Sequence, residues 1–325
     1  MSKTRIVTIV CWIVSALALV GLLIWLIAGT VFGGLFGNIG LNFGGSERLS
    51  GPFELDRTYT VQVGEIDTIR IDWVSGDVAV RPHGGSDIII NEYAQRELRD
   101  NERLSYSVSG STLEINFLER GLSFRRMPNK MLEVLVPYDL ADSLNLLSAS
   151  TVSARVNITD ISANTLRGNT VSGAFYAIGD FNSASIDTVS GNIELSGEIN
   201  DAALDTVSGR VTMNSTAIGA RVDIGTVSGR MDLNGDFISV RISTTSGNAD
   251  IVSTAVPSTL NASGVSGDVN LTIPAGDSIS VRHSAVSGSF SSEVPVTMEN
   301  RGADFDISSV SGSTRIRELS ASNSD

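Results

Sequence analysis

Hydrophobic and polar residues alternate along most of this 325-residue chain, and the alternation is organised around a short motif that returns about every 20 residues. The third residue of each Val-Ser-Gly or close variant is taken as position zero of the motif. These positions are Gly76, Ala154, Gly173, Gly191, Gly209, Gly229, Gly247, Gly267, Gly288 and Gly312. From Ala154 onward consecutive copies are 18 to 24 residues apart. Self-similarity at a period of this length is the sequence signature of a solenoid.

Apolar residues keep fixed places on both sides of the motif. In most copies the positions two and four residues after zero are apolar, as in Ile193 and Leu195, and so is the position five residues before zero, as in Leu204. Mostly polar residues stand between them, which is typical of strands with one buried face. We therefore predict an all-β parallel β-solenoid (β-helix) of about ten 18–24-residue coils, stacked about 4.8 Å apart. The bend at each motif favours glycine because glycine tolerates positive φ.

A third side of the coil is less regular than the other two. Apolar residues stand eight or nine positions after zero in several copies: Phe181, Ile199, Phe237 and Val256. This pattern leaves open whether the coil has three sides or is a flattened coil with two.

One copy of the tripeptide, Val108-Ser109-Gly110, is out of register with the others. Here the apolar period is carried by Leu113 and Ile115, which are three and five residues after the glycine. We therefore predict a hairpin turn at this place. It lies within residues 82–143, whose longer strands and charged connections indicate an antiparallel excursion near the start of the solenoid.

The N-terminal region has the pattern of a membrane anchor. Residues 6–31 contain no charged side chain, and 26 residues of helix are long enough to cross a ~30 Å hydrocarbon core with tilt. Lys3 and Arg5 precede this segment, which favours a cytoplasmic N-terminus over residues 1–5 and an extracytoplasmic β-domain. A cleaved signal peptide is the alternative, although its apolar region is usually only about 7–15 residues. A Gly-rich linker over 32–52, the β-domain over 53–318 and a polar tail over 319–325 follow.

Three segments together carry a resemblance to a known family. These are IRIDWVSGDVAV at residues 69–80, LEVLVPYDL at residues 132–140, and the serial TVSG copies that follow. Over about residues 53–318 the chain resembles the bacterial "putative adhesin" domain of unknown function. The resemblance implies a surface β-solenoid of the cell envelope, in a family some of whose members are linked to envelope stress and antimicrobial peptides. It implies no catalytic or ligand-binding residues.

Composition excludes several classes of function. The chain has 36 acidic and 23 basic side chains, and this acidic balance disfavours binding to nucleic acid. Cys11 is the single cysteine, so an intrachain disulfide is impossible. With only His83 and His283 beside it, a Cys/His zinc site is nearly excluded. We predict no cofactor.

Two carboxylates are the best candidates for chemistry. Asp187 and Asp205 both stand four residues before zero on the outward column, so one coil spacing of about 4.8 Å should separate them. Retaining glycosidases place two carboxylates about 5–5.5 Å apart, and such a pair can also bind a hard cation such as Ca²⁺. The simpler interpretation is a solvated acidic pair produced by repetition, and we assign no catalytic, cofactor-binding or metal-binding residue.

The remaining polar positions fit structural roles. The serine before each zero position has no histidine in register to activate it, so we expect a hydroxyl ladder or a turn-stabilising contact. His283 falls in the apolar column five residues before zero, which favours a structural histidine.

Charged side chains also repeat in register. Arg210 and Arg230 follow zero by one residue, and Glu194, Asp232 and Asp250 follow it by three, so opposite charges should interleave on one face. Exposed ion pairs of this kind contribute only about 0–1 kcal/mol each.

The function that follows is that of a membrane-anchored, extracytoplasmic β-solenoid. We expect a non-catalytic surface scaffold or adhesin-like binding module, single-pass in the cell membrane, whose partner is an envelope protein, a peptide or a wall polymer. Two alternatives stay open: a sensor or regulator of envelope stress, and a carbohydrate-active β-helix enzyme.

Overall fold

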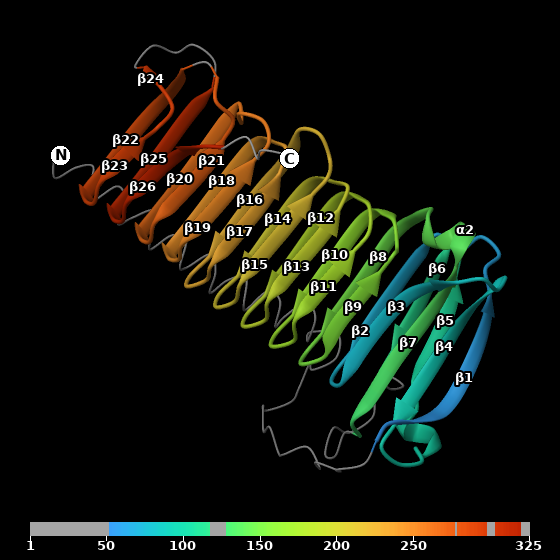
Figure 1. Ribbon diagram of the computed structural model, residues 1–325. Helices are drawn as coiled ribbons and strands as arrows, with labels where there is room; N and C mark the ends of the chain where they lie inside the picture. Colours follow the sequence, from blue (N-terminus) through green and yellow to red (C-terminus); the bar gives the residue numbers. More distant parts are fainter. Residues whose placement is uncertain (1–51, 118–127, 277, 298–302, 320–325) are drawn as a thin grey trace, which may run out of the picture. The chain divides into compact units, whose positions relative to one another are not determined.

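The computed structural model describes residues 52–117, 128–276, 278–297 and 303–319, and this part of the protein consists almost entirely of β-strands (Figure 1). Within it the helical elements are one 3-10 turn, η1 (Asp100–Glu102), and one short helix, α2 (Tyr138–Ala141). The predicted transmembrane segment 6–31 lies outside the described residues. Across the described ranges, no helix has the length and apolarity needed to cross a bilayer.

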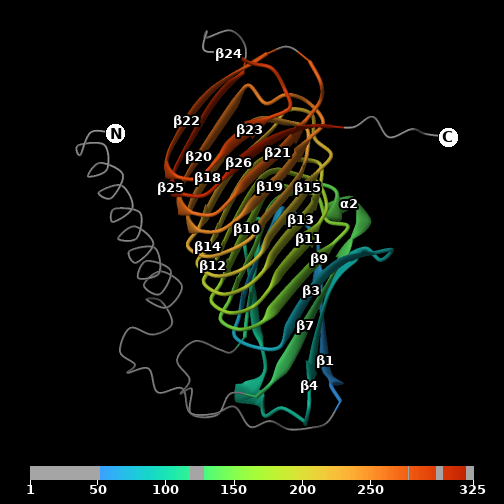
Figure 2. The same cartoon turned by 60° about the vertical axis from the view of Figure 1, so that its left-hand side comes forward.

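The strands form a parallel β-solenoid of about eight turns, with one strand of each turn in each of two sheets. Figure 2 shows strands of successive turns lying side by side. The coil is therefore two-sided. Of the apolar residues assigned to an irregular third side, Phe181, Ile199 and Phe237 begin β12, β14 and β18, whereas Val256 lies in the connection between β19 and β20. The predicted count of about ten coils was too high.

The described residues up to Ile186 form one compact unit. Its strands are β1 (Glu54–Gln62), β2 (Thr68–Trp73), β3 (Asp77–His83), β4 (Asp87–Ala94), β5 (Ser105–Ser109), β6 (Thr112–Asn116), β7 (Lys130–Pro137), β8 (Leu144–Thr151), β9 (Arg155–Thr159), β10 (Ala163–Thr170), β11 (Phe175–Ile178) and most of β12 (Phe181–Thr188). One sheet has the order β1-β4-β7-β3-β9-β11 and the other the order β5-β6-β2-β8-β10-β12.

The segment expected as an antiparallel excursion contains both strand orientations. β4 is antiparallel to β1 and β7, and β5 is antiparallel to β6 across the predicted hairpin at Gly110, which has φ +59°. However, β6 runs parallel to β2 and β7 runs parallel to β3. These two strands therefore extend the parallel stack beneath the first motif, and only part of the excursion is antiparallel.

The described residues from Asp187 onward form the second compact unit. Its strands are β13 (Ile193–Gly197), β14 (Ile199–Thr206), β15 (Val211–Ser215), β16 (Ala220–Thr226), β17 (Met231–Gly235), β18 (Phe237–Ser246), β19 (Ala249–Ser253), β20 (Thr259–Ser266), β21 (Val269–Ile273), β22 (Ile279–Ser287), β23 (Phe290–Ser292), β24 (Val296–Thr297), β25 (Asp304–Ser311) and β26 (Thr314–Glu318). The sheet orders are β13-β15-β17-β19-β21-β26-β23 and β14-β16-β18-β20-β25-β22-β24.

The last two turns are stacked out of chain order. The turn formed by β25 and β26 comes last in the sequence, yet it lies between β20–β21 and β22–β23. The register is continuous through it, since Ile307 faces Ala262 on one side and His283 on the other. The turn formed by β22 and β23 is therefore the outermost one (Figure 1), and we call it the end turn.

The Val-Ser-Gly corners have two geometries. In β12, β14 and β16 the strand ends at a threonine three residues before zero, and the Thr188 Oγ1 atom accepts a hydrogen bond from the Gly191 N–H at 2.9 Å. In β18, β20, β22 and β25 the strand continues to the serine before zero. Positive φ follows at Gly267 (+139°), whereas Gly209 has none. The expected positive φ is therefore limited to some copies of the motif.

Close stacking explains the glycine at the other corners. A Cβ atom on Gly209 would lie 2.0 Å from the carbonyl oxygen of Gly191, in the turn beneath it. Such a distance is far below van der Waals contact, so only glycine fits between the two turns without a shift of the backbone.

The core consists of the predicted inward columns and one that sequence reasoning missed. Ile193, Leu195 and Leu204 are at most 1% exposed. The threonine three residues before zero also points inward and is buried in five copies: Thr151, Thr170, Thr188, Thr206 and Thr226. The apolar face of each turn is thus bordered by a column of buried hydroxyl groups at the corner.

Candidate functional site

The two predicted carboxylates stand near the ends of neighbouring turns in the second unit. Asp187 is the penultimate residue of β12, and Asp205 is the penultimate residue of β14. Both side chains are half-buried. In the parallel ladder between β14 and β16, Asp205 faces Gly225, and a Cβ atom on that glycine would lie 2.1 Å from the Asp205 Oδ1 atom. The absence of a side chain at Gly225 therefore makes room for the carboxyl group.

Burial and repulsion together raise the pKa of Asp205 to about 6. The largest cause is desolvation, followed by the charges of Asp187 and Asp223, and a hydrogen bond from the Gly225 backbone opposes them. Burial also raises the pKa of Asp187. The pKa of Asp223 is raised by burial, against the attraction of Arg241. The site is thus a small acidic cluster in which Asp205 takes up a proton at a higher pH than an ordinary aspartate does.

Sequence reasoning found Asp187 and Asp205 but missed the contributions of Asp223 and Gly225. Asp223 stands six residues before zero. The alternation of polar and apolar residues predicts that side chains at this position point outward, and this pattern could have identified Asp223 as a neighbour of the pair. Among the described residues, no group of three or more His, Cys, Asp or Glu side chains is arranged to hold a metal ion. Asp187 and Asp205 are therefore close to each other, but the described residues do not form a set of ligands for a cation.

The predicted charge ladder lies at the beginnings of β15, β17 and β19. The Arg230 side chain is 2.8 Å from a carboxylate oxygen of Asp232 and 2.8 Å from one of Asp250. Arg210 lies 3.8 Å from Asp232. The interleaving of opposite charges is confirmed for these four residues, which hold adjacent turns together across the outer face of the sheet.

The backbone N–H groups of the serines before zero link the stacked corners. The Ser208 and Ser228 N–H groups donate at 2.9 Å to the carbonyl oxygens of Val189 and Val207 in the turn beneath. In the outer turns a second serine column, four residues before zero, pairs in register: Ser243, Ser263, Ser308 and Ser284. The outer face of this sheet thus presents hydroxyl groups at one spacing per turn.

His283 lies in the inward column of the end turn, as predicted. Its ring stacks on Phe290 with ring centres 5.2 Å apart, and its Nε2 atom is buried without a hydrogen-bond partner. Burial lowers the pKa of this imidazole. These observations support a structural role for the ring.

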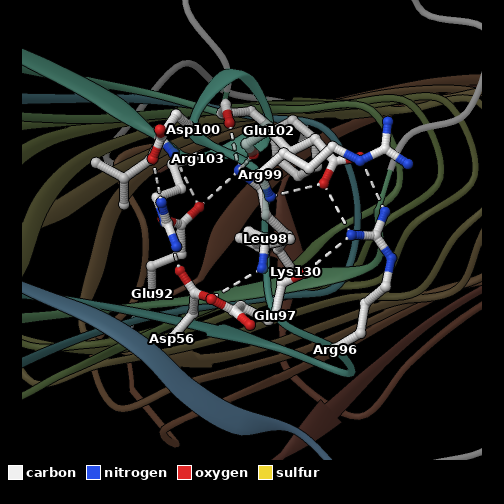
Figure 3. Close-up of polar contacts among 12 residues, drawn as sticks. Asp56, Glu92, Arg96, Glu97, Leu98, Arg99, Asp100, Glu102, Arg103 and Lys130 are labelled. Carbon is white, nitrogen blue, oxygen red and sulfur yellow. Dashed lines mark hydrogen bonds and ion pairs between the residues drawn. The ribbon is translucent and has the colours of Figure 1, made fainter.

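Sequence reasoning missed a buried ionic cluster around Lys130 in the first unit (Figure 3). The Lys130 and Glu92 side chains are both 0% exposed, and the Lys130 Nζ atom lies 2.7 Å from the Glu92 Oε1 atom. The same ammonium group donates to the carbonyl oxygens of Glu102 at 2.8 Å and Phe117 at 2.5 Å. Its three N–H bonds are thereby matched by three acceptors, which come from β4, from η1 and from the residue that follows β6.

Aromatic rings and further ion pairs surround this ammonium group. It lies 4.1 Å from the ring centre of Phe117 and 5.0 Å from that of Trp73, so it also makes cation–π contacts. Desolvation lowers the pKa of Lys130 to about 8 despite the opposing effect of Glu92. Around the cluster, Arg103 pairs with Asp56 at 2.8 Å. The arrangement holds elements together and leaves no room for a substrate at the ammonium group.

A known family matches most of the chain. Residues 66–325 match the model of the family described as Toastrack DUF4097. The chain belongs to this family. No curated protein matches the chain. The Toastrack match spans both compact units and includes every copy of the Val-Ser-Gly motif.

Solved structures similar to this Toastrack chain include proteins described as putative adhesins from Parabacteroides distasonis and Parabacteroides merdae. The first is 12% identical with a TM-score of 0.47, covering 82% of this chain and 98% of its own. The second is 13% identical with a TM-score of 0.47, covering 79% and 95%. A third, described as a putative lipid binding protein from Parabacteroides distasonis, is 13% identical with a TM-score of 0.48, covering 79% and 96%. Likeness at this level assigns no function to the Toastrack chain.

Proposed function

We propose that this Toastrack chain is a non-catalytic surface scaffold of the bacterial cell envelope. In this proposal residues 6–31 anchor it in the cell membrane, and the β-solenoid lies outside and binds an envelope protein, a peptide or a wall polymer. The supporting observation is that the outer faces of the sheets repeat the same polar groups in register from turn to turn. Repetition of this kind suits distributed contacts with an extended partner.

The carboxyl cluster fits a binding surface better than a catalytic centre. General acid–base catalysis needs an acid, a base and a stabilising group within hydrogen-bond reach of one reacting atom. Around Asp205 the neighbouring groups that act on its pKa are two further carboxyls and a backbone amide. Uptake of a proton by Asp205 would reduce the repulsion between these carboxyl groups, and it would supply no second catalytic group.

The proposal is tested by retention of envelope material on the full chain in membranes. Wild type and the double variant Asp187→Asn/Asp205→Asn should retain the same amount of purified wall polymer and envelope protein. A chain that lacks residues 262–325 should retain at least tenfold less, provided that its circular dichroism still shows β-structure. Turnover of a glycan by wild type that disappears in the double variant would instead place the protein among carbohydrate-active enzymes.

A further inference from the structure

Among the described residues, the end turn has a full-length strand neighbour along one side only. β22 pairs with β25 along almost its whole length. On its other side it pairs with β24 in just two positions, Ile279 with Val296 and Ser280 with Thr297. Beyond Ser280, no strand of the described residues follows β22 on that outer side. Among the described strands, the parallel stack therefore ends at β22, apart from its short pairing with β24.

Apolar side chains that are buried or half-buried in inner turns are more exposed at this edge. Phe290, two residues after zero, is 37% exposed, whereas Met231 and Ala249 at the same motif position are at most 1% exposed. Val286, two residues before zero, is 55% exposed. The end turn has the side chains of an inner turn and lacks the neighbour that would cover them.

The edge also lacks the features that normally prevent strands from pairing with other chains. Exposed edges are usually protected by lysine or other charges, by proline or by bulges. Residues 281–292 contain no Asp, Glu, Lys or Pro. The one charge there is Arg282, which is 2.9 Å from Asp304 and 3.5 Å from Asp306 within the same stack. By contrast, β1 carries three charged residues and a bulge after Leu55.

We propose that the end turns of two copies of this chain pair edge to edge. A second copy of the chain supplies an edge of the same kind, with the same exposed Val286 and Phe290 side chains. A two-fold axis would place β22 antiparallel to β22 of the partner copy, so the same edge of each molecule would form the hydrogen bonds between the two copies. Val286 and Phe290 would be covered in this arrangement.

The pairing gives the surface scaffold a specific partner. If the N-terminal segments anchor both copies, as the proposed function holds, contact between end turns links two membranes through a second copy of the same protein. The membrane-linking role rests on that proposed function, whereas the pairing of the edges rests on the structure of the end turn.

Clustering of liposomes tests the pairing with the full chain. Two liposome populations with different dyes should form mixed clusters when both carry wild-type protein. The double variant Val286→Lys/Phe290→Lys should reduce clustering at least tenfold, because it places repelling charges on both edges. Ile218→Lys is the matched control, since Ile218 is 89% exposed in the connection between β15 and β16, and it should cluster like wild type.

Every other outcome of the clustering and retention experiments shows which of the two proposals is wrong. Equal clustering by the edge variant and wild type, with equal melting temperatures, overturns the pairing of end turns. Clustering with protein-free liposomes overturns it in favour of lipid binding. If wild type fails to cluster but still retains envelope polymer, this inference fails and the proposed function stands. If wild type clusters but retains no envelope material, the edge pairing stands and the proposed partner class is wrong.

Discussion

At the scale of single residues, the inner corners are controlled by the distance between stacked turns. At Gly209 a methyl group would meet the Gly191 carbonyl oxygen at 2.0 Å, although φ there is one that other residues adopt. Glycine is therefore repeated at these corners because the strands are stacked so closely. Stacking at about 4.8 Å leaves no space for a Cβ atom wherever the corner brings one backbone directly over another.

Replacing Gly209 with alanine should lower the free energy of unfolding by about 1–3 kcal/mol, the usual cost of an overpacked contact. Thermal or urea unfolding of the full chain measures this. Gly276→Ala is the control, because a Cβ atom there would meet nothing within 4 Å. Equal melting temperatures for Gly209→Ala and wild type would contradict the steric explanation.

The carboxyl of Asp205 gives a pH-dependent prediction. Its pKa rises from 3.8 to about 6 on folding, so the folded state favours the protonated form. The stability that this group contributes is present below about pH 4 and is lost as pH rises through about 6. At 1.36 kcal/mol per pKa unit, Asp205→Asn should stabilise the protein by about 3 kcal/mol at pH 7 and have little effect at pH 4.

Unfolding in urea at both pH values checks this expectation, with Asp142→Asn, at an exposed position outside the cluster, as the control. A stabilisation that is equal at pH 4 and pH 7 would show that charge on Asp205 is not its cause.

At the scale of elements, the buried cluster predicts how the strands of the first unit depend on one another. Lys130→Met should lower the free energy of unfolding by about 3–5 kcal/mol, because it leaves the Glu92 carboxylate buried without its cation. The double variant Lys130→Met/Glu92→Gln should recover part of this loss, since it also removes the buried charge. Denaturant unfolding of both variants measures the difference, and an equal loss in the two would mean that the charge pair is not the cause.

Alternation of polar and apolar residues was sufficient to predict the elements themselves. Strands, their inward columns and the hairpin at Gly110 all follow from parity and turn chemistry. Lys130 shows the limit of the method, because it has the inward parity of Leu132 and Val134 on β7 but a residue type that suggests solvent. Only the three acceptors that chain folding brings to it explain its burial, and these come from positions 13 to 38 residues away.

The order of the turns was not predictable from the motif for a similar reason. Each copy of Val-Ser-Gly can stack on any other, because all copies present equivalent groups in equivalent register. Spacing indicated that turns stack, and it contained no signal that β25 and β26 would enter between earlier turns. At the carboxyl cluster, the same columns predicted that Asp187 and Asp205 are neighbours but not that Gly225 accommodates one of them.

At the scale of the whole molecule, the proposed topology predicts which side of the membrane a protease must reach. A specific cleavage site inserted at Ile218, which is 89% exposed, should be cut when the protease is added to intact cells or protoplasts. A cytoplasmic protein with the same site should survive. Protection of both proteins, followed by cleavage of both after lysis, would contradict an extracytoplasmic solenoid.

The out-of-order end of the stack has a consequence for biosynthesis. A chain emerging from the ribosome, or from a translocation channel, releases β22 and β23 before the strands that separate them from β20 and β21. Addition of turns one by one in chain order therefore cannot complete the end turn, because the turn on which it stacks, formed by β25 and β26, is not finished until Glu318 has emerged. A product that stops short of β26 would have all of its earlier turns but no correctly stacked end turn. A correctly stacked end turn therefore forms only in chains whose synthesis has passed β26.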